Sequence, residues 1–161
     1  MKATGIVRRI DDLGRVVIPK EIRRTLRIKE GTPLEIFTDR EGEIILKKYS
    51  PIGELNVFAK EYAEALAQSS GMVACITDHD QVVAAAGQGS RDYLGKAISG
   101  QLEEAISGRK SVFANGNDRH RIPVTQEQRD PLYSQIMQPI ISAGDAVGSV
   151  ILMGKNEKDV M

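Results

Sequence analysis

The sequence contains almost no cysteine, the residue whose disulfides and metal sites stabilise many small proteins. Cys75 is the only cysteine among 161 residues, so no disulfide can form within one chain and no cysteine-based metal site can be built. Tryptophan is absent and aromatic residues make up 4%, so we expect a core of Ile, Leu, Val and Ala. No apolar run approaches the ~18 residues of a membrane helix, and the first residues lack the apolar segment of a signal peptide. We therefore expect a cytoplasmic protein without a membrane partner.

A net charge is also absent, since the formal value is +0 at pH 7, yet the charges are unevenly distributed. Residues 1–29 contain nine basic and three acidic side chains, whereas residues 30–50 sum to −2 and residues 51–161 to −4. Six of those nine basic residues are arginines, whose planar guanidinium suits two-point contact with phosphate or guanine. The asymmetry predicts a polyanionic partner, namely double-stranded DNA, for the first thirty residues.

The first fifty residues predict the element order β-β-α-β-β and form our first domain, 1–50. Alternating apolar residues indicate strands over 4–10 and 15–19, separated by the turn sequence "DDLG". A short helix is expected over 20–28, because Ile22 and Leu26 share one face while the arginines lie off it. The segment 30–49 predicts two further strands around the turn "DREG".

Such a domain is too small to be stable alone. Hairpins are marginal in water, and domains near ~40 residues usually need staples or oligomerisation. No disulfide or metal site is available, yet the strand positions are strongly apolar. We therefore expect an intertwined, β-barrel-like homodimer in which two copies share one core.

Residues 51–161 predict a second domain of the α+β class. Ser50, Pro51 and Gly53 break the preceding pattern and mark the boundary. The expected elements are a helix over 54–71, a hairpin over 72–87, a helix over 91–108, a strand over 111–115, a long loop over 116–135 and a hairpin over 136–154. This order indicates an antiparallel sheet with helices on one or both faces.

No pattern in the second domain predicts an enzyme, a cofactor or a metal site. Cys75 lies in an apolar strand and is expected in the core. His79 is expected to be exposed in a turn, and His120 could pair with Asp118, but two histidines without a third ligand make a poor metal site. Residues 89–97 lack the spacing of a phosphate-binding loop, because five residues separate Gly89 from the next glycine instead of four.

The motifs of residues 1–50 are specific. "GIVR", "DDLGRVVIP", "EIRRTL" and "ILKKY" succeed one another in order. They resemble the transition-state-regulator type of swapped-hairpin DNA-binding domain. The stretches 50–66 and 93–99 resemble the GAF-like domain that comes after this module in a family of sporulation regulators.

The resemblance implies transcriptional control in a spore-forming bacterium, an intertwined N-terminal dimer, a homotetramer through the C-terminal domains, and a location at the nucleoid. It also implies a GAF-like fold that could hold a small ligand, although no residue identifies one. The DNA-contacting arginines of the family fall on Arg8, Arg15, Arg23 and Arg24. Charge alone adds three candidates, Arg9, Lys20 and Arg27.

Two other functions stay open at this stage. One is an antitoxin-like repressor of the same superfamily, although those proteins usually carry a short disordered tail instead of a second folded domain. The other is a ligand-binding sensor whose basic segment only dimerises. The family's GAF-like domain also continues into a long C-terminal helix that this sequence does not contain, so either that helix is lost or another element or subunit covers its face.

Overall fold

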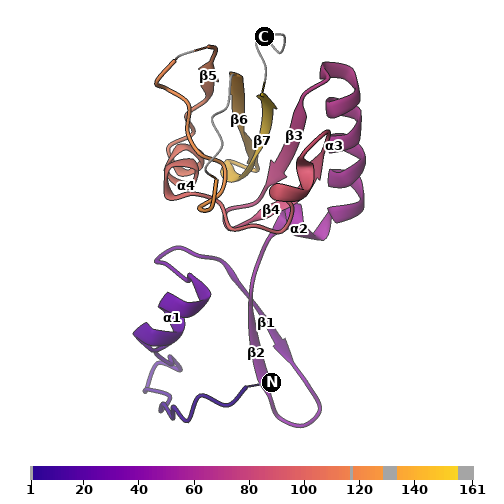
Figure 1. Ribbon diagram of the computed structural model, residues 1–161. Helices are drawn as coiled ribbons and strands as arrows, with labels where there is room; N and C mark the ends of the chain where they lie inside the picture. The colour runs from indigo at the N-terminus through magenta and orange to yellow at the C-terminus, as the bar shows by residue number, and fades with distance from the viewer. Residues whose placement is uncertain (1, 117, 129–133, 156–161) are drawn as a thin grey trace. The chain divides into compact units, whose positions relative to one another are not determined.

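The computed structural model describes residues 2–116, 118–128 and 134–155 (Figure 1). The chain divides into two compact units, Met1–Tyr49 (unit 1) and Ser50–Met161 (unit 2), which are described separately. Among the described residues, no helix is long and apolar enough to cross a membrane.

Unit 1 contains one short helix and one hairpin. Helix α1 spans Lys20–Leu26, and strands β1 (Leu34–Thr38) and β2 (Ile44–Lys48) pair antiparallel, with Leu34 opposite Lys48. The hairpin turn is closed by Asp39, whose Oδ1 accepts the backbone N–H groups of Glu41 and Glu43 at 3.0 and 2.9 Å. The predicted helix and the second predicted strand pair are confirmed.

The two strands predicted over 4–10 and 15–19 are wrong for a single chain, because neither segment forms a strand. The turn between them does form: the N–H of Gly14 donates to the carbonyl of Asp11 at 3.1 Å, and the N–H of Asp11 to the carbonyl of Arg15 at 3.0 Å. A strand needs a neighbour that accepts and donates its backbone hydrogen bonds. Among the described residues of unit 1, β1 and β2 pair only with each other, and neither segment pairs with them or with the other segment.

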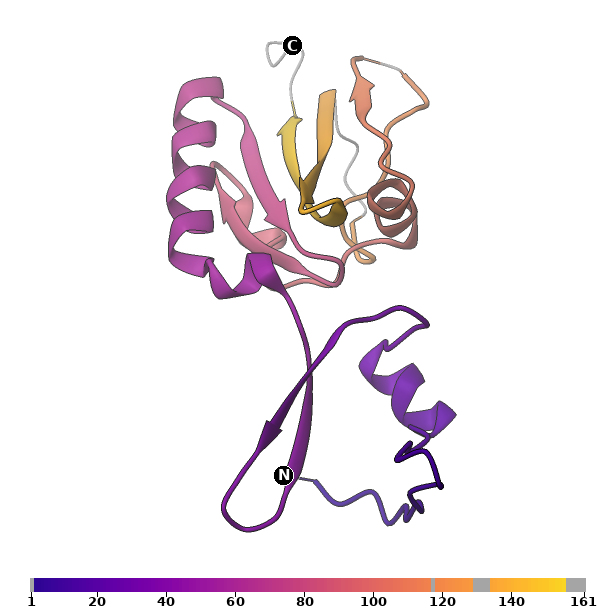
Figure 2. The same ribbon diagram turned by 180° about the vertical axis from the view of Figure 1, so that it is seen from behind.

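Unit 2 is built around a five-stranded antiparallel sheet of order β4-β3-β7-β6-β5. In Figures 1 and 2, helix α3 lies along one face and helix α4 lies on the opposite face, giving three layers. Each face carries its own cluster of buried apolar side chains. The elements in chain order are α2 (Pro51–Glu54), α3 (Asn56–Ser70), β3 (Val73–Thr77), β4 (Val82–Ala86), the 3₁₀ turn η1 (Ser90–Asp92), α4 (Gly100–Ser107), β5 (Val112–Ala114), β6 (Ser134–Ser142) and β7 (Asp145–Gly154).

Helix α3 packs on the sheet through alanines. Ala59, Ala63 and Ala67 recur every four residues and are buried against the small side chains of β3 and β4. Two larger apolar residues of the same helix, Phe58 and Tyr62, remain 60% and 67% exposed. Small residues let the helix lie close to the sheet, and the bulky ones are left on its outer side.

The helix predicted over 91–108 is correct only in its second half. Gly95 has φ of 75°, a left-handed conformation that ends a helix and suits glycine. Ala97 and Ile98 form isolated β-bridges to Gln81 and Thr125. Helix α4 starts after Ser99, whose Oγ accepts the N–H of Leu102 at 3.0 Å as an N-cap. Backbone pairing with residues distant in the sequence therefore replaces the first half of the predicted helix.

The thiol of Cys75 can report the unfolding of unit 2. It is fully buried in the central part of the sheet, and burial raises the pKa of its thiol to about 12. Thiol reagents attack the thiolate, so in the full chain at about pH 8 we expect very slow labelling. The rate should rise to that of a free thiol once urea unfolds unit 2. Labelling at the free-thiol rate in plain buffer would contradict this placement, and no second cysteine complicates the signal.

Candidate nucleic-acid interface

Six of the seven predicted DNA-contacting side chains are exposed on unit 1, and Arg27 is half-buried. Two lie in the extended segment before the first turn, one ends that turn, and four belong to α1 or its ends. In order they are Arg8, Arg9, Arg15, Lys20, Arg23, Arg24 and Arg27.

Arg15 is tied to the turn that precedes it. Its Nε donates to Oδ2 of Asp11 at 2.8 Å. The other oxygen of Asp11, Oδ1, accepts the backbone N–H groups of Leu13 and Arg15 at 2.9 and 2.8 Å. These bonds, led by the Arg15 backbone N–H and then its side chain, lower the pKa of Asp11 below its ordinary value.

Helix α1 positions a second group of arginines. It starts after Pro19, whose carbonyl accepts the N–H of Arg23 at 3.0 Å, and the side-chain Nε of Arg23 donates to the carbonyl of Ile18 at 3.0 Å. Arg27 ends the helix in the left-handed conformation with φ of 56°. Arg23 is thus held by its Nε, as Arg15 is, and no described residue engages the terminal amino groups of either side chain.

Other candidate side chains are not held in this way. Within the described part of the chain, no hydrogen bond or ion pair engages the side chains of Arg8, Arg9, Lys20 or Arg24. Exposed, unengaged cations of this kind can meet phosphate groups at varied positions along a duplex. The sequence identified all of these residues by charge or resemblance but did not reveal which of them are oriented.

Unit 1 leaves many apolar side chains in contact with solvent. Val7, Ile10, Leu13 and Val17 are 67% to 85% exposed, which is unusual for a compact domain. They are accompanied by an apolar hollow of about 360 Å³ lined by residues of the N-terminal segment, α1 and β2. The lining residues are Ile6, Arg8, Val16, Val17, Ile18, Pro19, Ile22, Leu26, Ile28 and Leu46. One copy of unit 1 therefore lacks a complete core.

An acidic group lies at the β1–β2 turn. Carboxylate oxygens of Asp39, Glu41 and Glu43 lie within 4.8 Å of one another. The backbone N–H of Glu43, and to a lesser degree its side chain and the N–H groups of Glu41 and Gly42, lower the pKa of Asp39. Because the same carboxylate closes the turn, the arrangement is accounted for by hairpin structure.

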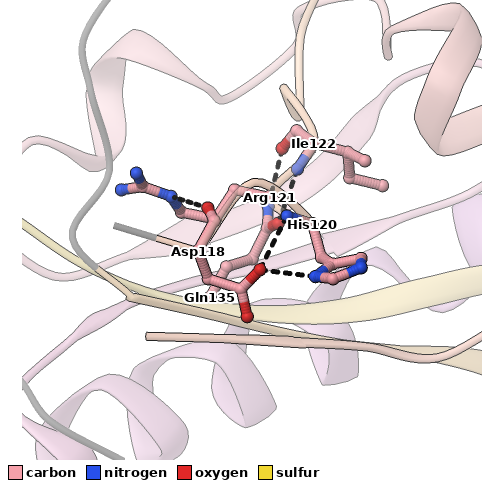
Figure 3. Close-up of polar contacts among 5 residues, drawn as sticks. All are labelled: Asp118, His120, Arg121, Ile122 and Gln135. Carbon is pink, nitrogen blue, oxygen red and sulfur yellow. Dashed lines mark hydrogen bonds and ion pairs between the residues drawn. The ribbon is translucent and has the colours of Figure 1, made fainter. Parts of the chain in front are cut away.

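In unit 2 the cysteine and histidine side chains considered from the sequence lie apart. Cys75 is in the core, His79 is exposed, and His120 lies in a loop where its N–H and ring both contact Asp118 (Figure 3). The bonds from His120 lower the pKa of Asp118. These three side chains do not converge on a site, and a ligand-binding residue is not identified among the described positions.

Gln135 is a structural residue that the sequence did not reveal. It is fully buried, and its amide forms two hydrogen bonds with the backbone of Ile122, accepting at 2.9 Å and donating at 2.8 Å (Figure 3). The side chain of Gln135 therefore acts as a substitute strand partner and holds the loop around residues 118–124 on the sheet. Part of the predicted loop 116–135, namely 117 and 129–133, lies outside the described residues.

Comparison with known proteins identifies the family. A model described as stage V sporulation protein T C-terminal, transcription factor, matches residues 54–161. Stage V sporulation protein T of Bacillus subtilis (strain 168) is 54% identical over 157 residues, which cover 98% of this chain and 87% of the relative. The chain belongs to the stage V sporulation protein T family.

Unit 1 of this family member has a second relative. The transition state regulatory protein AbrB of Bacillus subtilis (strain 168) is 67% identical over 51 residues, which cover 32% of this chain and 52% of AbrB. A model described as antidote-toxin recognition MazE, bacterial antitoxin, matches residues 7–54. The predicted resemblance of the first fifty residues to transition-state regulators is confirmed.

The fold seen in unit 2 of this stage V sporulation protein T family member is that of a GAF domain. It resembles the crystal structure of the GAF domain from Acinetobacter phosphoenolpyruvate-protein phosphotransferase, with a TM-score of 0.54 over 71% of this chain and 73% of that chain. The identity is 13%, so the likeness concerns the fold alone. The predicted α+β class and GAF-like fold are confirmed, and the chain is a member of a family of sporulation transcription factors.

Proposed function

We propose that this protein regulates transcription of sporulation-type genes by binding double-stranded DNA through unit 1. The observation that carries the proposal is the exposure of six basic side chains on a unit of about fifty residues. Arginine dominates the set, and its guanidinium pairs with phosphate oxygens and guanine edges. A role at DNA implies that the protein works at the nucleoid in the cytoplasm.

The binding form that we propose is an intertwined homodimer of unit 1. The exposed apolar residues and the hollow beside α1 are what a second copy would cover. The same second copy would supply the strand partners that the segments 4–10 and 15–19 lack. A two-fold dimer repeats the basic surface, so one duplex can meet two sets of arginines.

For unit 2 we propose a regulatory role that is not enzymatic. The relative with the greatest coverage is named as a sporulation protein and the matching family as a transcription factor. A GAF-like unit can join dimers into a homotetramer or respond to a small ligand, and a ligand would act by preferring one arrangement of the units over another. The outer side of α3, with Phe58 and Tyr62 exposed, supports the first of these roles.

An antitoxin-like repressor is the second candidate, because the antitoxin model matches residues 7–54. It shares the DNA-binding unit and differs in the remainder of the chain. Here the described residues from 50 onward form a sheet with two buried clusters, whereas an antitoxin uses an unfolded tail to wrap its toxin. A toxin reading frame beside the gene would favour this candidate.

Arginine substitutions test the DNA-binding proposal. We expect Arg15→Ala and Arg23→Ala each to lower the affinity for a fluorescent duplex by about tenfold or more. Each should also flatten the plot of log affinity against log salt by about one unit for every phosphate that is no longer bound. Fluorescence anisotropy of the full chain at salt concentrations from roughly 50 to 200 mM measures both quantities.

Arg40→Ala is the matched control for that experiment. Arg40 is exposed on unit 1 at the β1–β2 turn, outside the predicted contact set. Its replacement removes the same charge and should change neither affinity nor slope by more than a small factor. Equal losses of affinity in all three variants would show that only the total charge of the chain matters. Unchanged binding by Arg15→Ala and Arg23→Ala would show that these two residues lie outside the interface.

A further inference from the structure

The turn before Arg15 does more than reverse the chain. One carboxylate, that of Asp11, accepts three hydrogen bonds: two from backbone N–H groups and one from Nε of Arg15. The backbone bonds fix the turn, and the third fixes the direction of the arginine side chain relative to it. A long side chain that would otherwise sample many rotamers is thereby held at both ends of its stem.

The hydrogen bond from Nε of Arg15 to Asp11 leaves the two terminal amino groups of the guanidinium available for DNA. Nε is engaged, while the side chain of Arg15 is 69% exposed and no described residue engages its two terminal amino groups. Those two groups form the edge that pairs with guanine O6 and N7 or with a phosphate. Because ordering an arginine on binding costs conformational entropy, an arginine that is already oriented loses less when it meets DNA.

An acidic residue beside a DNA contact would ordinarily weaken binding. Phosphates repel carboxylates, so a merely exposed Asp11 should lower the affinity for every duplex. Its hydrogen bonds keep its pKa low, so Asp11 remains charged at the pH of DNA binding. The carboxylate of Asp11 repels DNA and at the same time orients Arg15. Such an arrangement lowers the overall affinity for DNA but favours discrimination between sequences.

We propose that Asp11 is a positioning residue for DNA recognition, which holds Arg15 in one orientation and so contributes to discrimination between sequences. This inference rests on the proposed DNA-binding function. It separates Arg15 from the unengaged cations Arg8, Arg9 and Arg24, which contribute affinity that depends little on sequence.

The chain contains its own matched control. Asp12 is the next residue, is exposed and carries the same charge, but no hydrogen bond or ion pair engages its side chain within the described residues. Asp11→Asn keeps an oxygen for the two backbone N–H groups while an amide nitrogen replaces the acceptor of Arg15 Nε. Asp12→Asn removes a charge at the neighbouring position and disturbs no such bond.

The experiment compares two probes: a duplex selected by the wild-type chain from a random-sequence pool, and the unselected pool at equal length. The measured quantity is the ratio of the two affinities. We expect Asp11→Asn to lower this ratio by about fivefold while binding to the pool is unchanged or slightly stronger. Asp12→Asn should strengthen binding to both probes slightly and leave the ratio unchanged.

A double-mutant cycle separates positioning from a structural effect. In an Arg15→Ala background, Asp11→Asn should cause no further loss of the ratio, because the side chain that it orients is gone. Arg15→Lys, which leaves the turn intact and keeps the charge, should preserve binding to the pool and lower the ratio. This variant keeps the test informative if Asp11→Asn disturbs folding.

Three outcomes would overturn the inference. Asp11→Asn could behave as Asp12→Asn does, its loss could persist in the Arg15→Ala background, or Arg15→Lys could retain the full ratio. Each of these leaves the proposed function intact, provided that the wild type binds the duplexes. A wild-type chain that binds neither probe at low salt would instead reject DNA binding itself, and the inference with it.

Discussion

Val17→Asp is expected to weaken strongly the proposed association of unit 1. Val17 is 69% exposed in one copy and lines the apolar hollow beside α1, so it occupies the surface that a second copy would cover. Burying an unpaired carboxylate there, twice in each dimer, costs several kcal/mol. We expect association at least ~100-fold weaker, since each tenfold step corresponds to about 1.4 kcal/mol, together with loss of DNA binding.

Sedimentation of the full chain over a range of concentrations measures this effect. Thr25→Asp is the control, because it adds the same charge at an exposed polar position of α1 and should leave association unchanged. Circular dichroism should show less strand signal in Val17→Asp than in the control. A Val17→Asp chain that associates as tightly as the wild type would show that this surface is not the dimer interface.

Gly148→Ala should have the largest effect on unit 2. A Cβ at this position would lie 2.0 Å from the carbonyl oxygen of Thr77, closer than any real contact. The crowding arises where β7 pairs with β3, next to the buried hydrogen bond between the hydroxyls of Thr77 and Ser149 at 2.7 Å. Backbone atoms would have to move apart, so we expect a loss of about 3 kcal/mol or more in the free energy of unfolding.

The label on Cys75 and thermal denaturation both report this loss. Cys75 lies on β3, two residues from Thr77, so opening of this strand pair exposes its thiol. We expect labelling in buffer to be at least ~100-fold faster than in the wild type, which corresponds to about 2.8 kcal/mol. Gly100→Ala is the control: apart from its chain neighbours and its own helix backbone, no atom lies within 4 Å of a Cβ there, and alanine favours a helix, so its stability should be equal or slightly higher. Equal stability of Gly148→Ala and Gly100→Ala would contradict the close approach of β7 and β3.

Sequence patterns predicted the elements whose partners are near in the chain. The hairpins of unit 2 and the hairpin β1–β2 were found because their strands alternate and a turn sequence joins them. Helix α1 was predicted from Ile22 and Leu26 four residues apart. In each case the information lies within some twenty residues, where periodicity is a reliable guide.

Elements that depend on distant or external partners were predicted less well. The segments 4–10 and 15–19 have the composition of strands, but a strand also requires a paired neighbour, and within the described part of one copy neither segment pairs with another strand. The helix predicted over 91–108 failed in its first half because Ala97 and Ile98 bridge to remote residues. The sequence likewise predicted the helix α3 but did not reveal that its alanines, and not Phe58 and Tyr62, face the sheet.

The candidate DNA-binding site was likewise predicted only in part. Charge and resemblance identified the seven basic residues, because a positive charge follows directly from the residue type. The orienting bonds of Arg15 to Asp11 and of Arg23 to the carbonyl of Ile18 depend on backbone geometry in a turn and at a helix start. Residue types alone do not specify that geometry, so the bond between Asp11 and Arg15 became visible only in the structure.

The proposed dimer of unit 1 would make DNA-binding activity depend on the concentration of the chain. Unit 2 has two buried clusters of its own, whereas in the proposed dimer unit 1 would complete its core only on meeting another chain. The concentration of completed DNA-binding modules then rises with roughly the square of the copy number while chains are scarce, by mass action. At a low rate of synthesis, little of this regulator would therefore bind DNA. A modest rise in synthesis would increase its DNA-binding activity over a narrow range of concentration.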